Sequence, residues 1–114
     1  MKIKHLYISA ILAIVQASSA WAVAPANFTV DFTNKGDISQ KNFAVSVGQK
    51  VRLQVNPKET GTGCMSDIMI PGLSGKAQPL VKGKPVVMEF TPTRPGTYNI
   101  SCSMGVARGS IKVK

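Results

Sequence analysis

The chain has 114 residues, two cysteines, one histidine and a formal net charge of +9 at neutral pH. This length is enough for one domain with one modest core, and not for two. The positive charge comes largely from lysines that are scattered along the chain without interleaved aromatic residues, which argues against a nucleic-acid-binding surface.

The first 22 residues have the three parts of a secretory signal peptide. A basic start with Lys2 and Lys4 precedes an apolar run over residues 6–15, and an Ala-x-Ala sequence ends at Ala22. The apolar run is shorter than the roughly 20 residues that a membrane span needs. We therefore expect cleavage after Ala22. The short basic start fits a bacterial signal, so we expect residues 23–114 to be a soluble periplasmic domain.

Cleavage there would also remove His5, the only histidine. A mature chain without histidine cannot form the His₂Cys site of blue copper proteins, a histidine-rich zinc site, or a Ser-His or Cys-His catalytic pair. The five acidic residues show no pairing that suggests acid–base catalysis. No phosphate-binding loop, nucleophile elbow or dinucleotide fingerprint is present. We expect a protein that is not an enzyme.

Apolar and polar residues alternate in several short segments of residues 23–114, which is the pattern of half-buried strands. Glycine and proline recur between these segments, and no segment has helical periodicity. We therefore predict an all-β fold, a small Greek-key β-sandwich of about seven to eight strands that is rich in antiparallel pairs. The predicted strands are 28–32, 43–47, 51–55, 64–70, 78–80, 86–90, 97–102 and 111–113.

Two side chains are expected to have structural roles in this sandwich. Tyr98 lies four residues before Cys102 on the same face of its predicted strand, and we expect it at a corner with its hydroxyl bonded to backbone. Met88 lies between Val86 and Phe90 on one face, where a methionine is expected to fill the core.

The sulfur atoms carry the most informative chemistry of the sequence. Cys102 ends a predicted strand, and Met104 follows on a short loop closed by Gly105. A strand-end thiol beside such a loop is expected to be accessible. Thiolates and thioethers are soft donors that select Cu(I) or Ag(I) over harder divalent ions, and Cys64 can join them. Spacing alone leaves two alternatives open, because two cysteines in an exported sandwich also commonly form a disulfide.

Several motifs resemble those of the cupredoxin-like domains of bacterial copper handling. This Cu(I)-binding group includes the copper chaperone CupA, its counterpart in a copper-exporting P-type ATPase, and cupredoxin domains of sulfite-exporter-like membrane proteins. The resemblance extends over residues 28–113. Its motifs are Gly63-Cys64, Glu89-Phe90-Thr91-Pro92, Pro95-Gly96-Thr97-Tyr98, and Cys102-Ser103-Met104-Gly105 followed by Arg108-Gly109.

The resemblance implies a ligand set. If the ligands of the family are carried over position by position, Cys64, Cys102 and Met104 would hold Cu(I). The family pattern is usually Cys-x-Met-x-Met, whereas Val106 stands at the place of the second methionine. The resemblance therefore implies one copper ion, for which Ag(I) is a possible surrogate. Met65 also carries sulfur, but strand alternation predicts that it lies on the face opposite Cys64.

The expected function is therefore the sequestration of Cu(I), or its transfer to another carrier or exporter by exchange of sulfur ligands. We expect a monomer whose partner is that copper carrier or exporter. A site without imidazole is poorly suited to cycling between Cu(I) and Cu(II), so storage or hand-over fits better than electron transfer. The alternative is a disulfide-stapled immunoglobulin-like binding module without metal.

Overall fold

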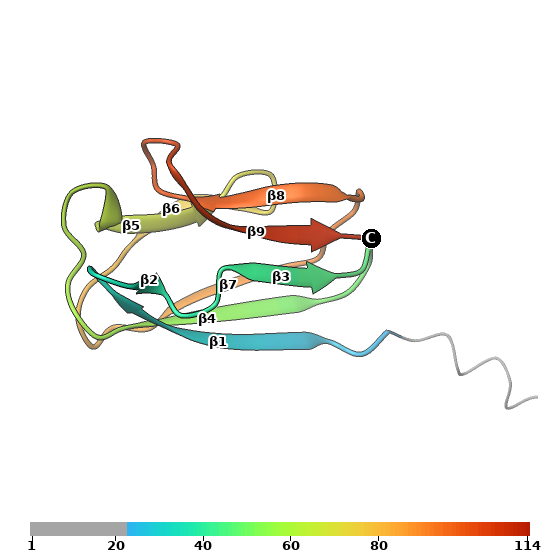
Figure 1. Ribbon diagram of the computed structural model, residues 1–114. Coiled ribbons are helices and arrows are strands. Elements are labelled where there is room, and N and C mark those ends of the chain that lie inside the picture. The colour runs from blue at the N-terminus through green and yellow to red at the C-terminus, as the bar shows by residue number, and fades with distance from the viewer. Residues whose placement is uncertain (1–22) are drawn as a thin grey trace, which may run out of the picture.

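The computed structural model describes residues 23–114, so the predicted signal peptide and its cleavage site lie outside the described residues. Residues 23–114 form two β-sheets that pack face to face (Figure 1). No helix of this part of the chain is long and apolar enough to cross a membrane. The predicted all-β sandwich is confirmed, with nine strands in the described residues.

The two sheets differ in size and in strand order. The four-stranded sheet has the order β2-β1-β4-β7, with β1 (Ala26–Thr33), β2 (Asp37–Ile38), β4 (Val51–Pro57) and β7 (Val86–Phe90). The five-stranded sheet has the order β3-β9-β8-β5-β6, with β3 (Asn42–Val45), β5 (Asp67–Ile70), β6 (Ser74–Pro79), β8 (Gly96–Ser101) and β9 (Ala107–Val113).

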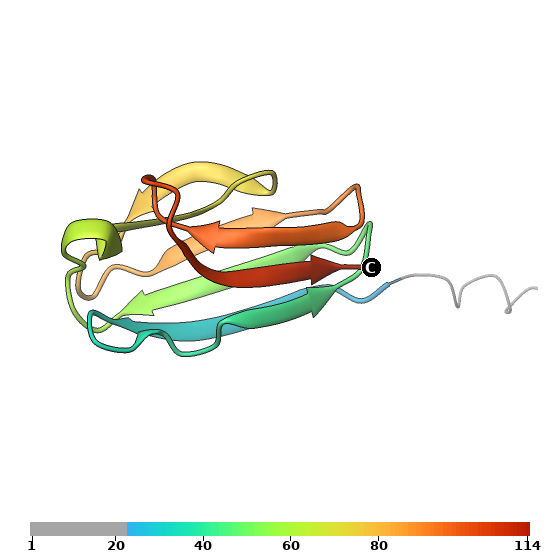
Figure 2. The same ribbon diagram turned by 45° about the horizontal axis from the view of Figure 1, so that its top comes forward.

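Most strand pairs are antiparallel, as predicted, but two are parallel. Strand β1 pairs with β4 in parallel, and β3 pairs with β9 in parallel. The β1–β4 pair accompanies a crossing of the chain, which leaves the first sheet after β2, forms β3 in the second sheet, and returns to the first sheet as β4. Figure 2 shows this crossing between the layers.

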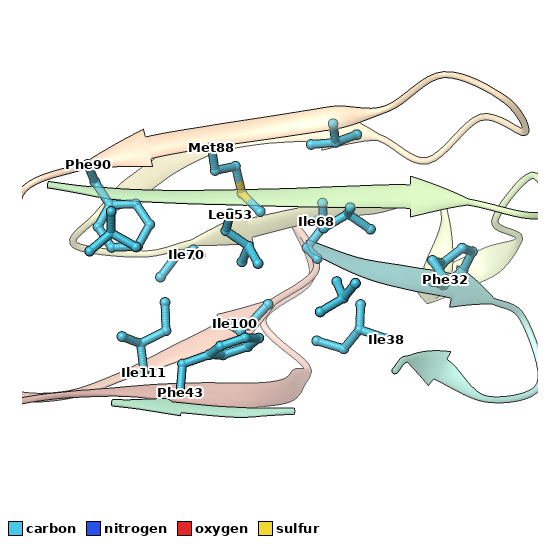
Figure 3. Close-up of a cluster of buried hydrophobic side chains, with 14 of the residues drawn as sticks. Phe32, Ile38, Phe43, Leu53, Ile68, Ile70, Met88, Phe90, Ile100 and Ile111 are labelled. Carbon is cyan, nitrogen blue, oxygen red and sulfur yellow. The ribbon is translucent and has the colours of Figure 1, made fainter. Parts of the chain in front are cut away.

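The core lies between the sheets and is built by alternation along the strands. Residues of β4 are alternately buried and half-buried, and those of β7 alternately buried and exposed, so each strand presents one apolar face to the other sheet. Figure 3 shows Leu53 and Met88 from one sheet facing Ile100 and Ile111 from the other. Met88 is fully buried, which confirms its predicted core role.

The predicted corner at Tyr98 is also confirmed. Its side chain is half-buried against the core, and its hydroxyl donates a hydrogen bond of 2.9 Å to the carbonyl oxygen of Arg94. The apolar ring thus covers the core while its polar end is satisfied by backbone.

The prediction of one strand over residues 64–70 is wrong in its first half. Residues Gly63–Met65 form a 3₁₀ turn, and β5 begins only at Asp67. Gly63 has a φ of +59°, and the Ser66 amide donates to the Gly63 carbonyl oxygen, which closes the turn. Cys64 therefore lies on a turn at the end of the sandwich and not in a sheet.

A buried ion pair connects the two sheets at the same end. Arg108 of β9 donates from Nε to the carboxylate of Asp37 on β2 at 3.2 Å, and the two side chains are only 4% and 11% exposed. The guanidinium also lies 5.6 Å from the centre of the Phe32 ring. Asp37 has a φ of +59°, a conformation that aspartate tolerates better than most residues.

Asp37→Asn is expected to lower the free energy of unfolding by about 3 kcal/mol, because it leaves the buried guanidinium of Arg108 without a counter-charge. Asparagine tolerates the positive φ, so backbone strain does not explain the loss. Denaturant unfolding measures it, and Asp31→Asn is the matched control. Asp31 lies 3.9 Å from Lys58 with both side chains more than half exposed, so the control should lose about 1 kcal/mol or less. Equal losses in the two variants would contradict the role given to Arg108.

Gly61→Ala is expected to destabilise the fold by about 1–3 kcal/mol or more, because a Cβ there would collide with the backbone carbonyl of Met65. Gly75→Ala is the matched control, since nothing lies within 4 Å of the position of its Cβ. Thermal unfolding of the two variants provides the comparison. A Gly61→Ala variant as stable as Gly75→Ala would mean that the turn over Gly63–Met65 is not packed as described.

Candidate metal centre

The two cysteines meet at one end of the sandwich. Cys64 lies in the turn Gly63–Met65, and Cys102 directly follows β8 at the start of the loop that leads to β9. In Figure 2 the turn is the short coil at the left end of the molecule. The fold brings the two residues, 38 positions apart in sequence, to a Cα–Cα distance of 6.1 Å, and they form a disulfide. Of the two alternatives for this pair, the structure contains the oxidised one.

The three sulfur atoms of the predicted ligand set differ in exposure. Cys102 is 1% exposed, Cys64 is half-buried, and Met104 is 75% exposed. The expectation of an accessible thiol at Cys102 is therefore wrong. The loop turns back on the strand end, because the Cys102 amide donates to the Val106 carbonyl and the Gly105 amide donates to the Cys102 carbonyl. An incoming reagent reaches the pair at Cys64.

Met65 is placed differently from the sequence prediction. Because the segment is a turn, strand alternation does not decide on which side Met65 lies. Its side chain packs partly against the core, and its sulfur accepts a contact of 3.8 Å from Nη2 of Arg108. The guanidinium thus engages a lone pair of the Met65 sulfur that a metal ion would otherwise use.

Asp67 links the two cysteine-bearing segments. Its Oδ1 accepts a hydrogen bond of 2.9 Å from the backbone amide of Ser103, the residue after Cys102. The backbone carbonyl oxygen of Asp67 accepts a hydrogen bond from Nη1 of Arg108. The hydrogen bonds from Ser103 and the nearby charge of Arg108 hold the pKa of Asp67 below its usual value near 3.8, against the opposing effect of burial.

Sequence reasoning assigned no role to Asp67 or to Arg108. Arg108 belongs to the Arg-Gly pair that carries part of the family resemblance, so a signal for it was available. Asp67 has no comparable signal, because its partner Ser103 is 36 residues away and an aspartate three residues after a cysteine follows no known pattern.

The side chains that could hold a metal ion here are mainly soft sulfur donors, since the Asp67 carboxylate is already bound to the Ser103 amide. Residues 23–114 contain no histidine, and no group of three or more histidine, cysteine, aspartate or glutamate residues in this part of the chain is placed to hold a metal ion. Two thiolates from a reduced Cys64 and Cys102, with the thioether of Met104, are a donor set that fits Cu(I) and not the harder divalent ions.

Solved structures with the same fold include copper proteins of several kinds. The chain is similar to a copper binding protein solved in its apo form (TM-score 0.64, 20% identity, 77% of this chain and 86% of that chain). It is similar to the metal-binding domain of the Streptococcus pneumoniae Cu(I)-exporting P-type ATPase CopA with Cu(I) (TM-score 0.65, 18% identity, 81% and 94%). It is also similar to dithionite-reduced auracyanin of Roseiflexus castenholzii (TM-score 0.58, 19% identity, 81% and 99%). At these identities the likeness establishes the fold.

A search of curated proteins finds no match to the sequence. The profile of the cupredoxin-like domain family matches residues 5–113, nearly the whole chain. The nine-stranded sandwich and this match agree with the resemblance seen in the motifs around Cys64 and Cys102. The chain belongs to the cupredoxin-like domain family.

Proposed function

We propose that the reduced form of this chain binds one Cu(I) ion through Cys64, Cys102 and Met104, and sequesters it or passes it to another copper carrier or exporter. The observation that carries the proposal is the meeting of two cysteines from distant parts of the sequence at one end of the fold, with Met104 two residues from one of them. Two structural neighbours, a copper binding protein and a Cu(I)-exporting ATPase domain with Cu(I), support a role in copper handling.

The donor set favours hand-over rather than electron transfer. Cu(I) accepts low coordination numbers and soft ligands, whereas no imidazole in residues 23–114 is available to stabilise Cu(II). Exchange of sulfur ligands requires a donor that an incoming carrier can reach. The half-buried Cys64 and the exposed Met104 meet this requirement, while the buried Cys102 would keep hold of the ion until the exchange is complete.

Copper binding and the disulfide are alternative states of the same sulfur atoms. A thiol reductant must break the Cys64–Cys102 bond before either sulfur can act as a thiolate ligand. We further propose that the domain works as a monomer in the periplasm, after removal of a signal peptide at Ala22. In that compartment disulfides form readily, so bound Cu(I) would protect the reduced pair from oxidation.

An anaerobic Cu(I) titration of the reduced protein against a competing chelator tests the proposal. We expect one tightly held equivalent of copper, and its loss in Cys64→Ser and in Cys102→Ser, because each removes one of two thiolates. Met104→Leu should weaken binding by about tenfold, the equivalent of 1.4 kcal/mol, and leave the fold intact.

Met88→Leu is the matched control for the methionine variant. It makes the same chemical change in the buried core, on β7 of the sheet that does not carry Cys102, and should leave the Cu(I) affinity unchanged. Undiminished Cu(I) affinity in Cys102→Ser would rule out this ligand set.

The disulfide itself favours a second candidate function, a binding module stapled by Cys64–Cys102 and without metal, now on a cupredoxin-like and not an immunoglobulin-like fold. In that case protein isolated without air should contain no free thiol, and reduction should cost roughly 2–5 kcal/mol of stability. The reduced protein would also fail to compete for Cu(I). Free-thiol titration of anaerobically isolated protein, followed by the copper titration, distinguishes the two candidates.

A further inference from the structure

The segments that carry Cys64 and Cys102 are connected by more than the disulfide. The Asp67 carboxylate, three residues after Cys64, accepts the Ser103 amide, one residue after Cys102, at 2.9 Å. A hydrogen bond between a carboxylate and a backbone N–H is charge-assisted and stronger than a neutral one. This connection uses no sulfur, so breaking the S–S bond does not remove it.

Arg108 fixes the position of Asp67. Its Nη1 donates to the Asp67 carbonyl oxygen and its Nη2 contacts Met65 Sδ at 3.8 Å, so it contacts the segment that follows Cys64 at two residues. The guanidinium is itself held, because its side chain is 4% exposed and paired with Asp37. Asp67 therefore faces the loop after β8 from a position that the buried Arg108 holds in place.

We propose that Asp67 is a positioning residue that keeps the thiols of Cys64 and Cys102 within bridging distance when the disulfide is reduced. The reduced chain then presents a preorganised pair of thiols instead of two independent ones. The inference deepens the proposed function, since this dithiol is the form that would bind Cu(I), but the positioning itself requires no copper.

Such positioning acts through the effective concentration of one thiol at the other. Closing a disulfide across 38 residues, or chelating a metal with the same two residues, requires both segments to be ordered at once. A link that survives reduction provides part of this order in advance, and so raises the effective concentration. Removing the Asp67–Ser103 hydrogen bond should therefore make both disulfide formation and metal chelation less favourable.

The equilibrium with glutathione measures this effective concentration without any metal. Oxidised glutathione and the protein dithiol give the protein disulfide and two molecules of reduced glutathione, so electrons and protons balance. The full folded protein is equilibrated in glutathione buffers of graded composition, and the oxidised fraction is quantified after acid quenching and thiol alkylation.

Asp67→Ala is expected to lower the equilibrium constant for disulfide formation by about tenfold, in line with the loss of a hydrogen bond to a charged group. Asp67→Asn should lower it by about threefold, since the amide oxygen still accepts a hydrogen bond but carries no charge. Glu89→Gln and Glu89→Ala are matched controls on β7, where the carboxylate is 72% exposed, and should leave the constant unchanged.

A merely structural role for Asp67 predicts a different result. If the side chain stabilises the oxidised and reduced proteins equally, its removal lowers the unfolding midpoint of both forms and leaves the glutathione equilibrium unchanged. That outcome in Asp67→Ala overturns the proposal. If Asp67→Ala does not fold, Asp67→Asn decides, and a change of less than about twofold overturns the proposal.

The copper titration of the unaltered protein separates this inference from the proposed function. A lowered glutathione equilibrium in Asp67→Ala, together with no Cu(I) binding by the unaltered protein, leaves the positioning role standing and removes the copper function. Tight Cu(I) binding by the unaltered protein, together with an unchanged glutathione equilibrium in Asp67→Ala, supports the copper function and removes the positioning role of Asp67.

Discussion

The buried guanidinium of Arg108 is the constraint on which the cysteine-bearing end of the fold depends. Removing such a charge from water is costly unless it is paired with an opposite charge and its nitrogens meet acceptors. Here Asp37, the carbonyl oxygen of Asp67 and the sulfur of Met65 supply those acceptors. These residues come from both sheets and from the segment that follows Cys64, so one side chain fixes three parts of the chain relative to one another. Polar contacts, rather than apolar packing alone, determine the geometry around the cysteines.

The strands of the sandwich follow from the local alternation of apolar and polar residues in the sequence. Residues of β7 alternate without exception between buried and exposed, and period-2 alternation predicted its bounds at Val86 and Phe90. The same pattern predicted most of β4 and the core position of Met88. It did not predict the parallel pairs, because alternation shows which face of a strand is buried and does not show which strand lies beside it.

The candidate site was harder to predict because its geometry depends on contacts between distant residues. The apolar side chains of residues 64–70 suggested one strand, yet Gly63 adopts a positive φ and the chain turns before β5 begins. Arg108 finds its carboxylate partner 71 residues away, and Ser103 finds Asp67 36 residues away. No local period encodes such pairings. The identities of the sulfur residues could be predicted from sequence, whereas the burial of Cys102 and the supports around it could not.

The two cysteines differ in a way that links reduction to the proposed transfer of copper. Cys102 is buried, so a reductant must attack the disulfide at Cys64. In the proposed transfer, a copper acceptor would likewise begin its exchange at Cys64 or Met104. Under the proposed function both partners would then approach the same end of the sandwich. A closed disulfide offers no thiolate, so under the proposed function Cu(I) would bind only after reduction, and the disulfide would form again only after the ion has left. The order of events would therefore follow from the use of the same two sulfur atoms in both states, and the burial of Cys102 decides where each partner enters.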